Sequence, residues 1–202
     1  MSEIRVDTIS EKTSANGVAI DSVTLKDGGA TLADNITFSA SGKGVHLGVT
    51  SATSSNLLDD YEEGSFSVEV ADALSGGNSN AMVNSGDVDG VYTKIGDMVF
   101  FSIAGTLNTT GLTGTDAIFL RGLPFTANNK SNFYECTNPR IAGGVSYNLS
   151  SGFTQVMSMV PANSTYLNFR EQGDSQTTKS MTVNQVVDDT SVRVQGMYHT
   201  DS

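Results

Sequence analysis

The first fifty residues place their apolar side chains in short pairs that cannot form a core within one chain. Between Val6 and Val49, turn-forming runs such as Asn16-Gly17 and Ser41-Gly42-Lys43-Gly44 separate these pairs. Each pair is typical of a short strand with one apolar face. Strands this short bury too little apolar surface to fold alone. The pairs are Val18 and Ile20, Val23 and Leu25, Ile36 and Phe38, and Val45 and Leu47.

Two structures are open for such a segment. It is disordered, or several copies wrap around a common axis and pool their apolar faces. The regular spacing of pairs and glycine turns favours wrapping, and three chains around one axis is the usual arrangement of β-structured fibres. A heptad pattern is missing, which excludes a coiled coil. We therefore expect residues 9–55 to form an intertwined β-structured trimeric shaft with the four apolar pairs as its core.

From Ser65 onward the pattern changes to longer strands. The strongest signal is Val91–Leu107, where Ile95-Gly96-Asp97 predicts a tight hairpin turn. Met98–Ile103 is apolar on both faces, so we expect one face against its own sandwich and the other against a neighbouring subunit. Residues 56–202 are thus predicted to form an all-β, jelly-roll-like β-sandwich head. Further predicted strands are Ser65–Val70, Ala117–Leu120, Ile141–Leu149, Phe153–Val160, Thr165–Phe169, Met181–Val187 and Val192–Tyr198.

Composition excludes several classes of function. The net charge is −11, with 11 basic residues against 22 acidic ones, so the basic patch of a nucleic-acid-binding protein is missing. Cys136 is the only cysteine, which rules out a disulfide within the chain. We find neither a signal peptide nor an apolar stretch of about 20 residues, and expect synthesis in the cytoplasm without membrane insertion.

Four carboxylates lie within five positions in Asp59-Asp60-Tyr61-Glu62-Glu63. A metal site or an acid/base pair is one interpretation, and a solvated acidic turn before the first head strand is the other. We favour the turn, because no histidine or further ligand lies nearby in the sequence. In Asp87-Val88-Asp89-Gly90, two carboxylates precede a glycine with the spacing found in calcium-binding loops. We favour a loop at the mouth of a hairpin, because the remaining calcium ligands are missing from the sequence. We therefore predict no catalytic residue, no metal ligand and no cofactor.

Several phrases resemble the fibre and tail-fibre proteins of tailed bacteriophages. Residues 10–28, SEKTSANGVAIDSVTLKDG, are similar to a glycine-punctuated shaft phrase, and residues 57–66, LLDDYEEGSF, resemble the junction that precedes a C-terminal head. Residues 91–107, VYTKIGDMVFFSIAGTL, resemble a strand of those heads. The junction departs from the family phrase LDDYEEGTWTP at residues 65–68, where it lacks the proline.

The resemblance implies a homotrimeric virion protein without enzymatic activity that assists host-cell attachment through its head. Residues 1–8 would be the peptide that docks onto another virion protein of the tail or capsid, with Ile4, Val6 and the adjoining Ile9 as candidate contacts. Two alternatives remain open: a capsid-decorating head fibre without an essential role in adsorption, and a glycan-degrading tailspike. The chain is short for a tailspike and lacks the repeat of a long β-helix.

A receptor, either a host cell-surface glycan or a protein, would be contacted by exposed polar loops. Two loops in the head are long enough, around residues 128–134 and 170–179. Aromatic rings in the first loop would stack on sugar faces. The candidate contact residues are Asn129, Lys130, Asn132, Phe133, Tyr134, Arg170, Gln172 and Asp174.

Overall fold

The computed structural model describes residues 35–49, 51–83, 88–130, 135–142, 148–186 and 188–201. The chain divides into two units between Ser39 and Ala40. Residues 35–39, the described part of the first unit, have no helix or strand. Ten predicted site residues lie outside the described residues: Ile4, Val6, Ile9, Val18, Ile20, Val23, Leu25, Asn132, Phe133 and Tyr134.

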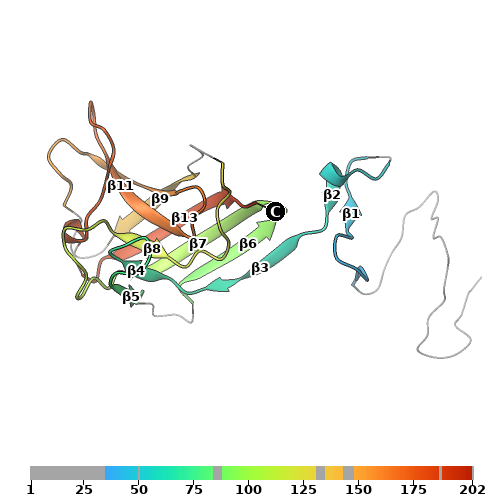
Figure 1. Ribbon diagram of the computed structural model, residues 1–202, viewed down its shortest axis with the longest axis horizontal. Coiled ribbons are helices and arrows are strands. Elements are labelled where there is room, and N and C mark those ends of the chain that lie inside the picture. Colours follow the sequence, from blue (N-terminus) through green and yellow to red (C-terminus); the bar gives the residue numbers. More distant parts are fainter. Residues whose placement is uncertain are drawn as a thin grey trace, which may run out of the picture. The chain divides into compact units, whose positions relative to one another are not determined.

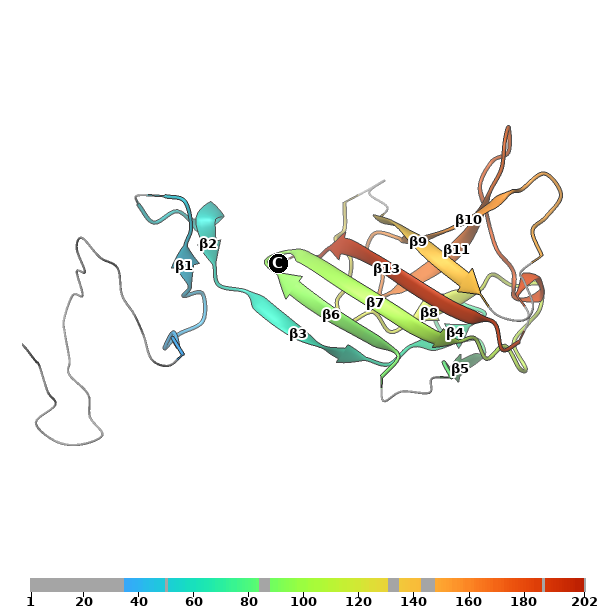
Figure 2. The ribbon, with the colours of Figure 1, turned by 180° about the vertical axis from the view of Figure 1, so that it is seen from behind.

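The second unit is built from antiparallel strands, which confirms the all-β prediction. One layer contains five strands that lie side by side in Figures 1 and 2. Their order across the layer is β3 (Tyr61–Phe66), β6 (Gly90–Ile95), β7 (Met98–Thr106), β13 (Ser191–His199) and β9 (Glu135–Ala142). The predicted hairpin turn is confirmed: β6 and β7 are joined at Gly96, whose φ of 60° favours glycine.

The second layer continues from β9. Its path is β9, β10 (Gln155–Val160), β11 (Tyr166–Gln172), β8 (Phe119–Arg121), β4 (Glu69–Ala71) and β5 (Ser79–Ala81), with β12 (Lys179–Ser180) paired to β11. Strand β8 ends at Arg121, directly before Gly122-Leu123-Pro124, as expected for a segment that contains a proline.

Strand β9 connects the two layers. Its first residues pair with β10 as far as Thr137, and from Asn138 onward it pairs with β13. Pro139, which has no backbone N–H to donate, follows the point of change directly. The predicted strand over Ile141–Leu149 falls mainly on residues 143–147, which lie outside the described residues. Strand β9 begins before it, at Glu135, and includes a proline, which in a sequence argues against a central strand.

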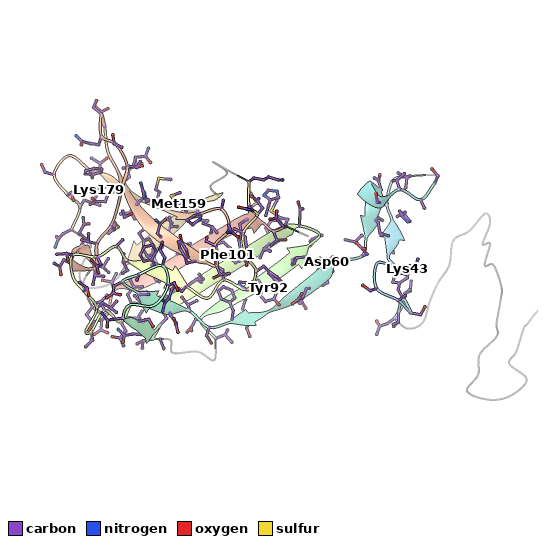
Figure 3. All side chains as sticks on the ribbon, in the orientation of Figure 1. Lys43, Asp60, Tyr92, Phe101, Met159 and Lys179 are labelled. Carbon is purple, nitrogen blue, oxygen red and sulfur yellow. The ribbon has the colours of Figure 1, made fainter. Side chains whose placement is uncertain are left out.

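A single core fills the space between the layers. Val99, Phe101 and Ile103 alternate along β7 toward the interior, and Leu167 and Phe169 of β11 belong to the same buried cluster. Full burial of one such side chain stabilises the fold by roughly 1.5–3 kcal/mol. Figure 3 shows Phe101 among the side chains of the two layers.

Close approach of neighbouring side chains explains some glycines of the first layer. A Cβ atom on Gly90 would lie 2.4 Å from the ring of Phe66, and one on Gly196 would lie 2.2 Å from Thr137 Cγ2.

The prediction of a strand over Met181–Val187 was wrong. That segment forms a 3-10 helix, Val183–Gln185, and the Thr182 and Gln185 side chains cap its first turn.

A small hairpin precedes the head strands. Strand β1 (Val45–His46) pairs with β2 (Leu57–Leu58), and the 3-10 helix η1 (Ser54–Asn56) lies between them. Gly44 is required here, because a Cβ atom at that position would lie 2.0 Å from the carbonyl oxygen of Leu58. Residues predicted to end the shaft therefore pair with residues predicted to begin the head.

Candidate functional site

The predicted shaft residues that the structure describes are exposed. Ile36, Phe38, Val45 and Leu47 have exposed fractions of 63%, 45%, 45% and 55%. Only Val45 belongs to a strand, and that strand has two residues. Large apolar side chains with this exposure keep about half of their surface in water within the single chain. Their predicted burial against other copies stays a prediction.

The prediction of an acidic turn was wrong from Tyr61 onward, because the acidic junction continues into the first strand of the head. Tyr61–Phe66 is β3, and successive carboxylates point to opposite faces of it. Glu62 accepts a hydrogen bond from the Tyr92 hydroxyl at 2.5 Å, and Glu63 accepts one from the Tyr61 hydroxyl at 3.0 Å. These contacts raise the pKa of both tyrosines, since each hydroxyl donates to a carboxylate and would be repelled by it when ionised.

Asp60, the residue before β3, forms an ion pair with the buried Lys94. Three carboxylates of the junction thus have three different donors, an arrangement that fits the beginning of a strand better than an acid/base pair. Among the described residues, no group of three His, Cys, Asp or Glu side chains is placed to hold a metal ion. Asp89 of the calcium-like phrase accepts a hydrogen bond from the Val68 N–H at 2.9 Å. This bond connects the residue before β4 to the residue before β6.

The described residues of the two predicted receptor loops lie near opposite ends of β11. Asn129 and Lys130 are exposed and follow Asn128. The carbonyl of Asn128 accepts a hydrogen bond of 3.0 Å from the N–H of Asn163, which lies just before the start of β11. Gln172 ends β11, and Asp174 lies in the exposed turn after it. A strand of seven residues spans roughly 20 Å. The described members of the two sets therefore cannot contact one small ligand together.

Arg170 has contacts that the sequence did not suggest. It is half-buried in β11, and its guanidinium donates to the Ser180 hydroxyl at 3.2 Å and to the Thr178 carbonyl at 3.1 Å. Within the described part of the chain, its buried Nε atom has no hydrogen-bond partner, and neither has the buried Oδ1 of Asn168 two residues earlier. Arg170 therefore fastens the hairpin between β11 and β12.

Two buried carboxylates were missed by the sequence analysis. Asp72 accepts the Thr113 N–H at 2.9 Å and two hydrogen bonds from Asn78, both 2.8 Å long, and these donors hold its pKa well below the usual range. Glu171 is fully buried, and Ser150 N–H donates to its Oε1 at 2.6 Å. Both carboxylates fasten loops.

The environment of Glu171 has two opposing effects on its pKa. Burial raises the pKa, but the hydrogen bonds from Ser150 and Gln185 and the ammonium group of Lys179 outweigh burial and lower it overall. Oε2 has no hydrogen-bond donor among the described residues, and Lys179 Nζ lies 3.3 Å from it as an ion pair. A sequence signal for this site was missing, because the donors are 8 to 21 residues away in the chain.

The surface that β3, β6, β7, β13 and β9 turn away from the core is a candidate for an interaction; we call it the outer face. Phe100 on β7 is 46% exposed and Met197 on β13 is 51% exposed, and the two residues are directly paired. Glu63, Thr93, Phe100 and Met197 form one row across four strands. Further exposed apolar residues of this face are Tyr61, Val91 and Ile95.

The outer face is hollowed between Glu63 and Phe100. The hollow has a volume of about 650 Å³, and Val91, Thr93 and Ser102 line it from β6 and β7. The prediction for Met98–Ile103 holds on its inner side, where Val99, Phe101 and Ile103 are buried. The side that carries Phe100 is not covered by any described residue to the same extent, and its cover by a neighbouring subunit stays a prediction.

Comparison with known proteins leaves the family open. No protein-family model matches the chain. No curated protein matches it either. In the described part of the chain, the helical turns are too short and too polar for a membrane-spanning helix.

Proposed function

We propose that this protein is a structural virion component, a short homotrimeric fibre of a tailed bacteriophage that mediates or assists attachment to the host cell. The observation that carries the proposal is the exposure of Ile36, Phe38, Val45 and Leu47 in the single chain. Packing between copies removes these side chains from water, which is the main favourable term in association. The resemblance of residues 10–28 and 57–66 to fibre phrases supports a phage assembly in particular.

In this proposal residues 9–55 form the intertwined shaft, and residues 56–202 form a jelly-roll-like head. Residues 1–8 dock onto another virion protein of the tail or capsid. The head binds a host cell-surface glycan or protein and catalyses no reaction. The two-layered antiparallel fold supports a sandwich head of this kind.

The decisive experiment locates the protein on intact phage particles by immunogold electron microscopy. Label at the tail tip supports the attachment fibre, whereas label on the capsid surface supports a decorating fibre. Unlabelled particles would refute a virion role. Incubation with host polysaccharide provides a second measurement, because shortened glycans would favour a tailspike and contradict the non-enzymatic proposal.

A matched pair of variants tests the shaft. Sedimentation of the full chain at micromolar concentration should show a trimer, and Ile36→Ser should weaken it. Leu74→Ser is the control, because Leu74 is also exposed, at 55%, but lies in the head. A stable monomer of the unmodified chain contradicts the proposed shaft, and equal effects of the two substitutions contradict a specific role of Ile36.

A further inference from the structure

Charge is unevenly distributed over the outer face. Glu63 lies on β3, which pairs with β6 alone among the described strands and so forms one margin of the face. At the opposite margin, Arg193 of β13 pairs directly with Arg140 of β9. Both arginines are exposed, while Val192 and Val194 on either side of Arg193 are buried. The face is therefore acidic at one margin, apolar in the middle and basic at the other.

The arginine pair indicates that an anion belongs at this margin. Like charges directly opposite each other on neighbouring strands repel and destabilise the sheet. Arg121, Lys94 and Lys179 each have a carboxylate partner, but Arg140 and Arg193 form no ion pair within the described residues. The two arginines, together with Ser102 and Gln195, line a hollow of about 210 Å³. A carboxylate that enters the hollow would remove the repulsion.

The apolar middle of the face indicates that this carboxylate comes with a protein surface. Phe100, Met197, Val91 and Ile95 are exposed between the two margins, and a contiguous apolar area rimmed by charge is typical of a protein interface. The chain itself offers the matching pattern, because its own Glu63 margin is acidic and exposed. A second copy therefore fits the apolar and the charged parts of the face together.

Symmetry determines which margins meet. In a cyclic assembly, two points meet across the interface when they lie at the same height along the rotation axis. Glu63 shares a row with Phe100, whereas Arg193 pairs with Ala104, four residues further along β7. Four residues correspond to roughly 13 Å along the strands. The two margins are three to four strands apart, which corresponds to roughly 17 Å across the strands. Glu63 and the arginines lie at equal heights when the axis is inclined by roughly 35–40° to the strands.

We propose that the outer face is a subunit interface of a cyclic homo-oligomer, in which Glu63 of one copy binds Arg140 and Arg193 of the next. The apolar residues of the face then surround the rotation axis. The proposal rests on the homotrimer of the proposed function for the number of copies, and it adds a contact in the head that does not involve the shaft. If the rotation axis instead ran parallel to the line from Glu63 to the arginines, Glu63 of one copy would face Glu63 of the next. Repulsion between the two carboxylates disfavours that arrangement.

Charge reversal in the full chain tests the contact. Glu63→Arg should raise the dissociation constant of the trimer about tenfold or more, even though it lowers the net negative charge. Arg140→Glu combined with Arg193→Glu should have a similar effect, and the chain that carries all three substitutions should recover association. Lys130→Glu is the control, because Lys130 is exposed outside the face and its reversal should leave the constant unchanged. Analytical ultracentrifugation measures each constant.

Zero-length cross-linking provides a second measurement that does not depend on weakened assembly. Arg193→Lys keeps the charge and adds an amine that carbodiimide couples to a carboxylate. Glu63 and residue 193 lie roughly 20 Å apart within one chain, so a bond between them can form only between copies. We expect mass spectrometry to identify this cross-link in trimers, and Glu63→Gln to remove it.

The outcomes separate this inference from the proposed function. An unmodified trimer that tolerates both reversals and gives no cross-link overturns the interface but leaves a shaft trimer standing. A monomeric chain overturns both. If the arginine reversal leaves the trimer intact and abolishes binding of free glucuronate, the hollow is a ligand site and the interface is overturned.

Discussion

The hydroxyl of Tyr198 provides the most direct test of how the C-terminal strand is held in the fold. Tyr198 is 0% exposed on β13, and its hydroxyl donates to the carbonyl of Phe125 at 3.1 Å. The same oxygen accepts the Phe125 N–H at 3.3 Å. Tyr198→Phe keeps the ring, which packs edge-to-face on Phe101, and removes only these two hydrogen bonds.

The loss of stability in Tyr198→Phe can be estimated from the two backbone groups of Phe125 that lose their hydrogen-bond partner. The variant leaves one backbone N–H and one carbonyl without a partner, and a buried polar group without a partner costs about 1–3 kcal/mol. Phe125 is half-buried and lines a hollow of about 470 Å³, so water reaches part of it. We therefore expect a loss of about 1–2 kcal/mol in the free energy of unfolding, which lowers a urea midpoint by about 0.5–1 M.

Urea unfolding at one fixed protein concentration measures this loss, because assembly also contributes to stability. Tyr61→Phe is the matched control. Its hydroxyl also donates a hydrogen bond, to Glu63, but Tyr61 is 60% exposed, so we expect a change within about 0.5 kcal/mol. Equal stability of the Tyr198 variant and the unmodified protein would refute the reasoning from burial and hydrogen bonding.

Three further predictions concern the head. Gly196→Ala should destabilise it by about 1–3 kcal/mol in urea unfolding, because the added Cβ atom clashes with the stiff side chain of Thr137; unchanged stability would contradict this packing. The lowered pKa of Glu171 adds stability above its unfolded pKa of about 4.3 that is lost as the pH falls, so Glu171→Gln should flatten acid unfolding monitored by circular dichroism. Burial, as the largest cause, raises the pKa of Tyr198, so stability should fall as the pH rises above about 10, and Tyr198→Phe should reduce this fall.

The hairpin of β6 and β7 shows where local pattern was sufficient for prediction. Val99, Phe101 and Ile103 alternate with more polar or exposed positions, and Gly96 supplies the turn. Both signals act between neighbours in sequence, so here they did not depend on which distant residues the fold brings together. The strand ends were predicted within a few residues for the same reason.

The segment 181–187 shows where pattern was insufficient. Its alternating apolar residues predicted a strand, but Val183 enters the core from a short 3-10 helix, and Met181 enters it from the residues just before that helix. The capping pair Thr182 and Gln185 was visible in the sequence, and it competes with strand pairing for the same backbone groups. The start of strand β9 was missed because its partners β10 and β13 come later in the chain.

The features of the candidate sites also divide into those that local pattern predicts and those that only the tertiary structure decides. The residue pattern alone predicted that the first fifty residues form no core of their own, because that prediction follows from local spacing. The same pattern placed Glu63 in a turn, whereas the structure places it within β3. The pairing of Arg193 with Arg140, their distance from Glu63 and the separation of the receptor loops by the length of β11 depend on strand register and order. Register joins residues that are far apart in the chain, so these features appear only once the two layers have formed.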